Sequence, residues 1–191
     1  MASISPFHAD LPARRQNIGQ ARQLLIDAGH PEGLKLDLIT ADVDPGMVDL
    51  ADLVQKMAAP AGFDISPTKV PSDVYWDSYW GQTPFHIGSW NFRPSIDETL
   101  ALAFHSNSVW NESRWFNAEL DALLDEARSE ADLAQRKALY QQVQEIIMEE
   151  GAVIIPVFRS VLSAVHKRVQ GFTPHPAGWI SLRNVQIVEQ A

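Results

Sequence analysis

The stretch that decides the fold is LKLDLITADVDPGMVDLADLVQKMAAPAGFDISPTKV, residues 34–70. It opens with leucines that alternate with other side chains over Leu34–Thr40, the pattern of a strand with one buried face. Asp44 and the proline after it predict the start of a helix, because aspartate caps helices and proline suits the first turn. A second strand is expected at Phe63–Val70, and Pro67 within it indicates an edge position. The stretch therefore predicts a strand, a helix and another strand in succession.

The same alternation continues on both sides of this stretch. Apolar residues at helical spacing predict further helices at 17–28, 73–80, 97–104, 120–127 and 132–150. Capping boxes support the starts at Asn17 and Asp132. Additional strands are expected at 85–90, 152–158, 161–166 and 184–188. The fold class that follows is α/β, or α+β, with a mixed sheet flanked by helices.

The composition is that of an ordinary globular chain with an acidic balance. The 191 residues include 24 acidic and 15 basic side chains, for a net charge of −9. This balance argues against a nucleic-acid partner, which would need a basic face. The absence of cysteine excludes disulfides, thiolate metal sites and a cysteine nucleophile. No apolar run approaches the roughly 20 residues of a membrane span. The N-terminal residues lack the features of a secretory signal peptide, so none is expected in this chain.

Sequence motifs for catalysis are missing. The chain contains no G-x-S-x-G elbow, no P-loop and no dinucleotide fingerprint. Its six histidines show no metal-ligand spacing, so neither a metal nor a cofactor is expected. Carboxylates are abundant but fall on helix faces, where a catalytic pair cannot be chosen without geometry. We expect a binding protein rather than an enzyme. The alternatives are a carboxylate-based hydrolase on an α/β scaffold and a ligand-free interaction domain.

The segment GSWNFRPSID, residues 88–97, is the strongest candidate for a binding site. It joins an expected strand to an expected helix, and ligands of α/β proteins bind at the carboxyl ends of strands. Trp90 and Phe92 offer aromatic walls, and Asn91 offers an amide. Arg93 could hold a carboxylate or phosphate through a pair of hydrogen bonds. The alternative for Trp90 is plain core packing.

Two neighbouring features leave alternatives open. Asp97 is expected to cap the helix that follows, and pairing between Asp97 and Arg93 is the alternative use of the arginine. Trp110 either packs under the loop or lines the cleft. A second aromatic group lies on one face of the expected helix at 73–80, where core packing is the favoured use: Trp76, Tyr79 and Trp80.

Six stretches in order resemble the second half of family-5 extracellular solute-binding proteins, the oligopeptide- and dipeptide-binding type. They are 21–33 (ARQLLIDAGHPEG), 85–90, 90–104, 117–124 (NAELDALL), 136–158 and 169–172 (VQGF). The resemblance implies that residues 1–16 are a lead-in from the missing N-terminal half. It also implies that 17–175 form the C-terminal lobe and that 176–191 are a tail returning to the first lobe.

The resemblance also implies a function. Such proteins are type II periplasmic binding proteins, which enclose a solute between two lobes by hinge closure and deliver it to an ABC permease. They are periplasmic or lipid-anchored, and relatives carry peptides, opines, sugars or metal chelates. The implied partners are therefore a small-molecule solute, the permease and the N-terminal lobe. Peptide-binding members place an aspartate at the position of Arg93, where it meets the ligand's α-amine. A cation there predicts an anionic solute instead.

Overall fold

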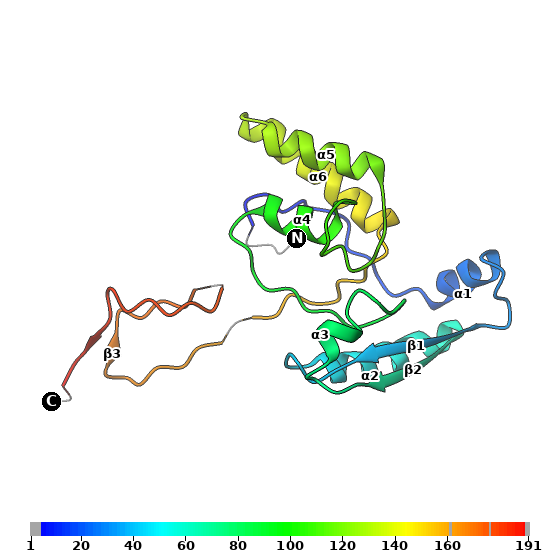
Figure 1. Cartoon of the computed structure of the whole chain (residues 1–191), viewed down its shortest axis with the longest axis horizontal. Helices are drawn as coiled ribbons and strands as arrows, with labels where there is room; N and C mark the ends of the chain where they lie inside the picture. The colour runs from blue at the N-terminus through cyan, green and yellow to red at the C-terminus, as the bar shows by residue number, and fades with distance from the viewer. Residues whose placement is uncertain (1–4, 161, 176, 190–191) are drawn as a thin grey trace.

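The computed structural model describes residues 5–160, 162–175 and 177–189. Parts of three expected segments lie outside these residues: the lead-in at 1–16, the strand at 161–166 and the tail at 176–191. Figure 1 shows the elements of residues 34–78 on one side of the molecule and the three helices of residues 96–150 gathered on the other. After these helices the chain passes back between the two groups and extends away from both.

The first part of the chain forms a parallel β-α-β unit, as the sequence predicts. β1 (Leu34–Thr40) and β2 (Phe63–Lys69) pair in parallel along their whole length. α2 (Met47–Ala58) connects them and packs against the sheet. Leu38 and Ala51, which are fully buried, lie in the core of this unit. The alternating leucines of β1 therefore have the buried face that their pattern indicates.

The start of α2 differs from the expected one. The cap position is Gly46, whose φ of 88° is left-handed and which makes no side-chain cap bond. Asp44, the expected cap, lies two residues earlier, and its carboxylate pairs with Arg159 at 3.5 Å. Pro67 lies in β2, whose only strand partner in the described part of the chain is β1. The edge position predicted from Pro67 is confirmed.

Short helical elements flank this unit. α1 (Ile18–Asp27) begins after Asn17, whose Oδ1 accepts a hydrogen bond from the backbone N–H of Gln20 at 3.0 Å. This cap is the one that the sequence predicts. The 3-10 helix η1 (Ala59–Ala61) follows α2 directly. The aromatic helix α3 (Tyr75–Ser78) is shorter than expected.

The expected third strand is reduced to a single parallel bridge between Ile39 and His86. Ile39 N donates to Phe85 O at 3.1 Å and Ile87 N donates to Ile39 O at 2.9 Å, so this segment lies beside β1. The ladder stops there because Ile87 O accepts a hydrogen bond from the Tyr75 hydroxyl at 2.5 Å instead of from a strand. The residues that follow form a loop at the carboxyl end of β1.

Three helices form the second core. α4 (Ile96–Phe104), α5 (Ala118–Ser129) and α6 (Leu133–Glu150) pack around side chains that include the fully buried Leu124 and Val143. α5 and α6 lie side by side in Figure 1, with α4 beneath them. The apolar faces that predict these helices are the faces that they bury.

The second predicted capping box and the N-terminal segment both attach to α6. Asp132 Oδ1 accepts from the backbone N–H of Gln135 at 2.9 Å, as predicted. The buried amide of Gln144 donates to Phe7 O at 2.9 Å and accepts from Ala9 N at 3.3 Å. These bonds hold the lead-in segment on the helical core.

The two strands expected after α6 are wrong in the described residues. Residues 152–158 and 162–166 run as irregular chain with no strand partner in that part of the protein (Figure 1). Most of their apolar side chains are exposed, with Ile154 at 75% and Leu162 at 91%, whereas Val153 packs against the helical core. The β-forming residues are present, but a strand needs a neighbour to satisfy its backbone groups.

The last strand pairing lies in the C-terminal arm, the described residues after 166. β3 (Val169–Gln170) pairs antiparallel with β4 (Gln186–Ile187), which is the only remnant of the strand expected at 184–188. The described chain thus contains two separate two-stranded sheets, one parallel and one antiparallel, rather than one mixed sheet. Helices alternate with the parallel strands, and the architecture is that of an α/β lobe.

Candidate functional site

A small cleft of about 190 Å³ lies at the carboxyl end of β1. Its lining residues come from α3 and the turn that follows it, from the loop after the third β-segment (residues 85–87, which lie beside β1) and from the loop after α4: Trp76, Trp80, Ser89, Trp90, Asn91, Arg93 and Trp110. Four of the five residues expected to bind a ligand meet here, namely Trp90, Asn91, Arg93 and Trp110. Loops at the carboxyl ends of parallel strands are the usual place for a ligand in such sheets.

The aromatic wall is centred on Trp80. Its ring centroid lies 6.0 Å from that of Trp76, 6.4 Å from Trp90 and 5.6 Å from Trp110. Trp90 also packs against the helical core, so its indole lines the cleft and contributes to core packing at the same time. Trp110 is half-exposed and lines the cleft. Tilted rings at these separations form a continuous apolar surface with π faces available to a ligand.

The expectation that the second aromatic group packs in the core is confirmed for Tyr79 and Trp80, which pack against the core of the β-α-β unit. It is wrong for Trp76, which is 43% exposed and lines the cleft together with Trp80. Tyr75 is fully buried in the same core. The signal was present in the sequence, because residues four apart on a helix share a face. What the sequence could not indicate is that this face borders a cleft.

Arg93 is the charged group of the cleft. Its Nε is buried and has no hydrogen-bond partner in the described part of the chain, and no ion pair of Arg93 is found there. Trp80 Nε1 is likewise buried without a partner. Buried donors without acceptors are costly in a folded protein and are often completed by a ligand or water. The cleft therefore combines apolar walls with hydrogen-bond donors and one positive charge.

The expected roles of Asp97 are wrong. Both of its carboxylate oxygens accept from Arg128 Nε at 3.2 Å, so Asp97 does not neutralise Arg93. Nor is Asp97 the helix cap, because Ser95 occupies that position without a side-chain cap bond. Asp97 is the second residue of α4, in its first turn, where its charge favours the helix N-terminus. Its alignment toward α5 could not be read from the local sequence.

Phe92, the fifth expected residue, does not line the cleft. Its ring packs edge-on against His175, with centroids 6.3 Å apart, and His175 stacks on Trp179 at 4.9 Å. The two aromatic residues of the loop at 88–97 therefore have different surroundings. Trp90 faces the cleft, whereas Phe92 holds the C-terminal arm.

Glu112 contacts the residues around the cleft and was not singled out by the sequence patterns. Its Oε1 accepts a hydrogen bond from Trp90 Nε1 at 2.6 Å, and its Oε2 lies 3.1 Å from His86 Nε2. Both side chains of the His86–Glu112 pair are largely buried. The pKa of Tyr75 is raised, first by burial and then by the charge of Glu112. In the sequence, the only indication of a special role for Glu112 was its place two residues after Trp110.

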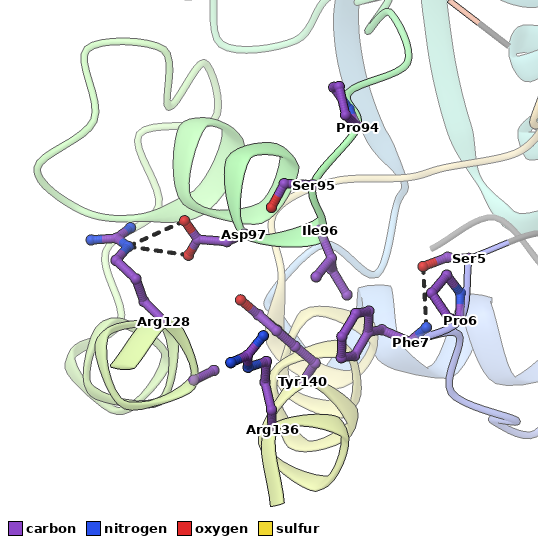
Figure 2. Close-up of a pocket in the computed structure, with 11 residues that line it drawn as sticks. Ser5, Pro6, Phe7, Pro94, Ser95, Ile96, Asp97, Arg128, Arg136 and Tyr140 are labelled. Atoms are coloured by element: carbon purple, nitrogen blue, oxygen red, sulfur yellow. Dashed lines mark hydrogen bonds and ion pairs between the residues drawn. The ribbon is translucent and has the colours of Figure 1, made fainter. Parts of the chain in front are cut away.

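A larger hollow of about 460 Å³ lies between α4, α5, α6 and the N-terminal segment (Figure 2). Its charged groups already have partners. Figure 2 shows Arg128 directed at Asp97, and Arg136 donates to the carbonyl of Glu130. Tyr140 is buried, and burial followed by the charge of Asp97 raises its pKa. Because its polar side chains serve the fold, this hollow is a weaker candidate than the cleft.

In the part of the chain that the structure describes, no group of three His, Asp or Glu side chains is arranged to hold a metal ion. Within the same residues no helix has both the length and the apolar character to cross a membrane.

Known proteins resemble this chain in sequence. No family model matches it. The dipeptide-binding protein DppE of Bacillus subtilis is 26% identical over 175 residues, which are 88% of this chain and 32% of DppE. Heme-binding protein A of Haemophilus influenzae is 30% identical over 177 residues, again 88% of this chain and 32% of the relative. This chain is homologous to part of a family-5 solute-binding protein of ABC transporters.

The fold agrees with this relationship to the solute-binding proteins. The structure of a clavulanic acid biosynthesis oligopeptide-binding protein superposes with a TM-score of 0.85 over 96% of this chain and 37% of that protein, at 22% identity. The chain spans about a third of the length of the curated relatives that it matches. Those relatives are binding proteins, and two further relatives, the probable deoxycholate-binding protein YgiS and the probable D,D-dipeptide-binding protein DdpA of Escherichia coli, are periplasmic proteins.

Proposed function

We propose that this chain is the C-terminal lobe of the substrate-binding component of an ABC importer. Residues 17–175 would form the lobe, 1–16 would lead in from the N-terminal lobe and 176–191 would return to it. The cleft would supply one wall of a site that the second lobe closes by hinge motion. The observation that carries the proposal is a cleft lined by four tryptophans at the carboxyl end of β1, in a chain homologous to solute-binding proteins.

The solute that best fits this wall is a small organic anion, such as a peptide or opine engaged through a carboxylate. Arg93 lines the cleft with no ion-pair partner among the described residues. A guanidinium between aromatic rings attracts a carboxylate and repels an ammonium. The free amine of a peptide would therefore bind elsewhere in the closed site.

The partners of the proposal are the N-terminal lobe, the membrane permease and the solute. The apolar side chains of the segment after α6 are exposed, with Ile154 at 75%, Phe158 at 57% and Leu162 at 91%. A run of exposed apolar residues on irregular backbone is typical of a surface that another polypeptide covers. The periplasm, or the outer face of the membrane, is the proposed location.

Two matched probes test the proposal. N-acetyl-dialanine carries a carboxylate and no ammonium, whereas dialanine amide carries an ammonium and no carboxylate. Titration of the 15N-tryptophan-labelled chain, followed by the indole N–H resonances, detects even millimolar affinities. We expect the acetylated probe to shift the Trp80 and Trp110 resonances at concentrations at which the amide does not.

Arg93 is tested with a charge-matched control. Arg93→Gln is expected to weaken binding of the acetylated probe at least tenfold, because a hydrogen bond to a charged group contributes about 1.5–3 kcal/mol and about 1.4 kcal/mol is a factor of ten. Arg183→Gln makes the same charge change on the exposed C-terminal arm and should leave binding unchanged. Equal effects of both variants would remove Arg93 from the site. Failure of carboxylate and ammonium probes alike to shift any tryptophan would count against the binding function itself.

A further inference from the structure

The carboxylate of Glu112 joins Trp90, which lines the cleft, to His86 in the segment that lies beside β1. One oxygen accepts from the Trp90 indole N–H at 2.6 Å, and the other lies 3.1 Å from His86 Nε2. The Glu112 side chain is 16% exposed and that of His86 is 8% exposed. The other ring nitrogen of His86 lies 3.3 Å from Thr83 O, so the imidazole itself is fixed on both sides.

This arrangement restrains the indole of Trp90. A carboxylate with one oxygen occupied by each neighbour cannot rotate without losing one of the two contacts. Charge-assisted hydrogen bonds of this length are among the stronger ones in proteins. The bond directs the only polar atom of the Trp90 side chain toward Glu112, so the ring can offer a ligand only its apolar surface. Trp90 packs at 6.4 Å from Trp80 in this orientation.

We propose that Glu112 is the positioning residue that sets the orientation of Trp90 in the cleft. The inference rests on the proposed function for its effect on binding, but the orientation of the indole is measurable without any solute. Glu112 touches no solute in this scheme. It acts through Trp90, and it uses His86 as the second anchor that keeps its carboxylate in place.

Gly88 supplies independent support for this assignment. A Cβ added to Gly88 would lie 2.7 Å from Glu112 Oε2 and 3.1 Å from Oε1. Both separations are shorter than ordinary van der Waals contact, so the glycine makes room for the carboxylate. Its φ is not left-handed, so the backbone alone does not require glycine here. Gly88→Ala should therefore displace Glu112 without altering either hydrogen-bonding partner.

The test follows the Trp90 indole N–H by 1H–15N spectroscopy, with its resonance assigned from Trp90→Phe. In the unaltered chain we expect slow exchange with solvent. Glu112→Ala should speed that exchange at least tenfold and shift the resonance upfield. Glu112→Gln, which keeps an acceptor oxygen, should restore most of the protection. Gly88→Ala should reproduce the effect of Glu112→Ala.

Matched controls separate positioning from general damage. Glu119→Gln removes a charge from an exposed position on α5, and Gly19→Ala adds a methyl group where the nearest atom is 3.7 Å away. Both should leave the Trp90 resonance unchanged. An unaltered Trp90 resonance in folded Glu112→Ala and Gly88→Ala would overturn the inference.

Binding supplies the second readout. The dissociation constant of N-acetyl-dialanine, measured at the Trp80 and Trp110 resonances, should rise about fivefold in Glu112→Ala and recover in Glu112→Gln. A changed Trp90 resonance with an unchanged dissociation constant would overturn the effect on binding. If the unaltered chain binds neither probe, the proposed function fails, while the exchange data still decide whether Glu112 positions Trp90.

Discussion

Tyr75→Phe removes one hydroxyl from the point where the sheet meets the cleft. Tyr75 is fully buried, and its hydroxyl donates to Ile87 O at 2.5 Å. No other hydrogen bond to that carbonyl is found among the described residues. The substitution therefore leaves a buried acceptor without a donor while changing the packing volume very little.

The expected loss of stability follows from that unsatisfied carbonyl. A buried acceptor left without its partner costs about 1–3 kcal/mol, and we expect a value near 2 kcal/mol here. For a chain of this size, that loss corresponds to a fall in melting temperature of about 4–8 °C. Urea unfolding followed by circular dichroism gives the free energy, and the m-value should stay constant because the surface exposed on unfolding is unchanged.

Tyr79→Phe is the matched control. It removes the same atom from a half-buried tyrosine just after α3, whose hydroxyl has no hydrogen-bond partner in the described residues. We expect its free energy of unfolding to change by less than about 0.5 kcal/mol, the usual range for a substitution away from a specific contact. Equal effects of the two variants would show that the bond to Ile87 does not stabilise the fold, and would refute the reasoning.

Three further predictions concern the rest of the lobe. Leu124→Ala, at a fully buried position between α5 and α6, should lower the free energy of unfolding by about 2–5 kcal/mol in the same urea assay. Asn117→Ala should cost about 1 kcal/mol, because Asn117 Oδ1 accepts from Leu120 N at 3.0 Å, whereas Ser95→Ala should cost almost nothing, since Ser95 makes no side-chain cap bond. The pKa of Tyr75 is raised by burial and then by Glu112, so the folded state favours its neutral form. That contribution is complete below the unfolded pKa of about 10 and is lost as pH rises through the folded pKa. The alkaline loss of stability should accordingly be smaller in Tyr75→Phe.

Local patterns were sufficient wherever the structure depends on neighbours in the sequence. The β-α-β unit follows from alternation in β1, from apolar spacing in α2 and from Pro67 at the edge. The caps at Asn17 and Asp132 are single side chains bonding three residues ahead, and both are confirmed. These features need no knowledge of the tertiary fold.

The candidate site was predictable only in part, because it depends on which segments meet. The sequence of the loop at 88–97 was enough to predict Trp90, Asn91 and Arg93 as site residues. Trp76 and Trp80 join them only through the packing of α3. The separation of Asp97 from Arg93 depends on Arg128, which is 31 residues away from Asp97 in sequence.

The segment after α6 is a case in which a local pattern predicts strands that are not found in the described residues. Its β-branched and aromatic residues predict strands, yet residues 152–158 and 162–166 pair with no strand in the described chain. Strand propensity reflects a fit to a half-buried pleated surface rather than an intrinsic backbone preference. Sequence therefore marks this segment as strand-forming, and only a neighbouring strand can complete it. Under the proposed function that neighbour belongs to the second lobe. Supplying that lobe should protect the amides of this segment from hydrogen exchange, whereas the helical core around Leu124 should keep the protection that it already has.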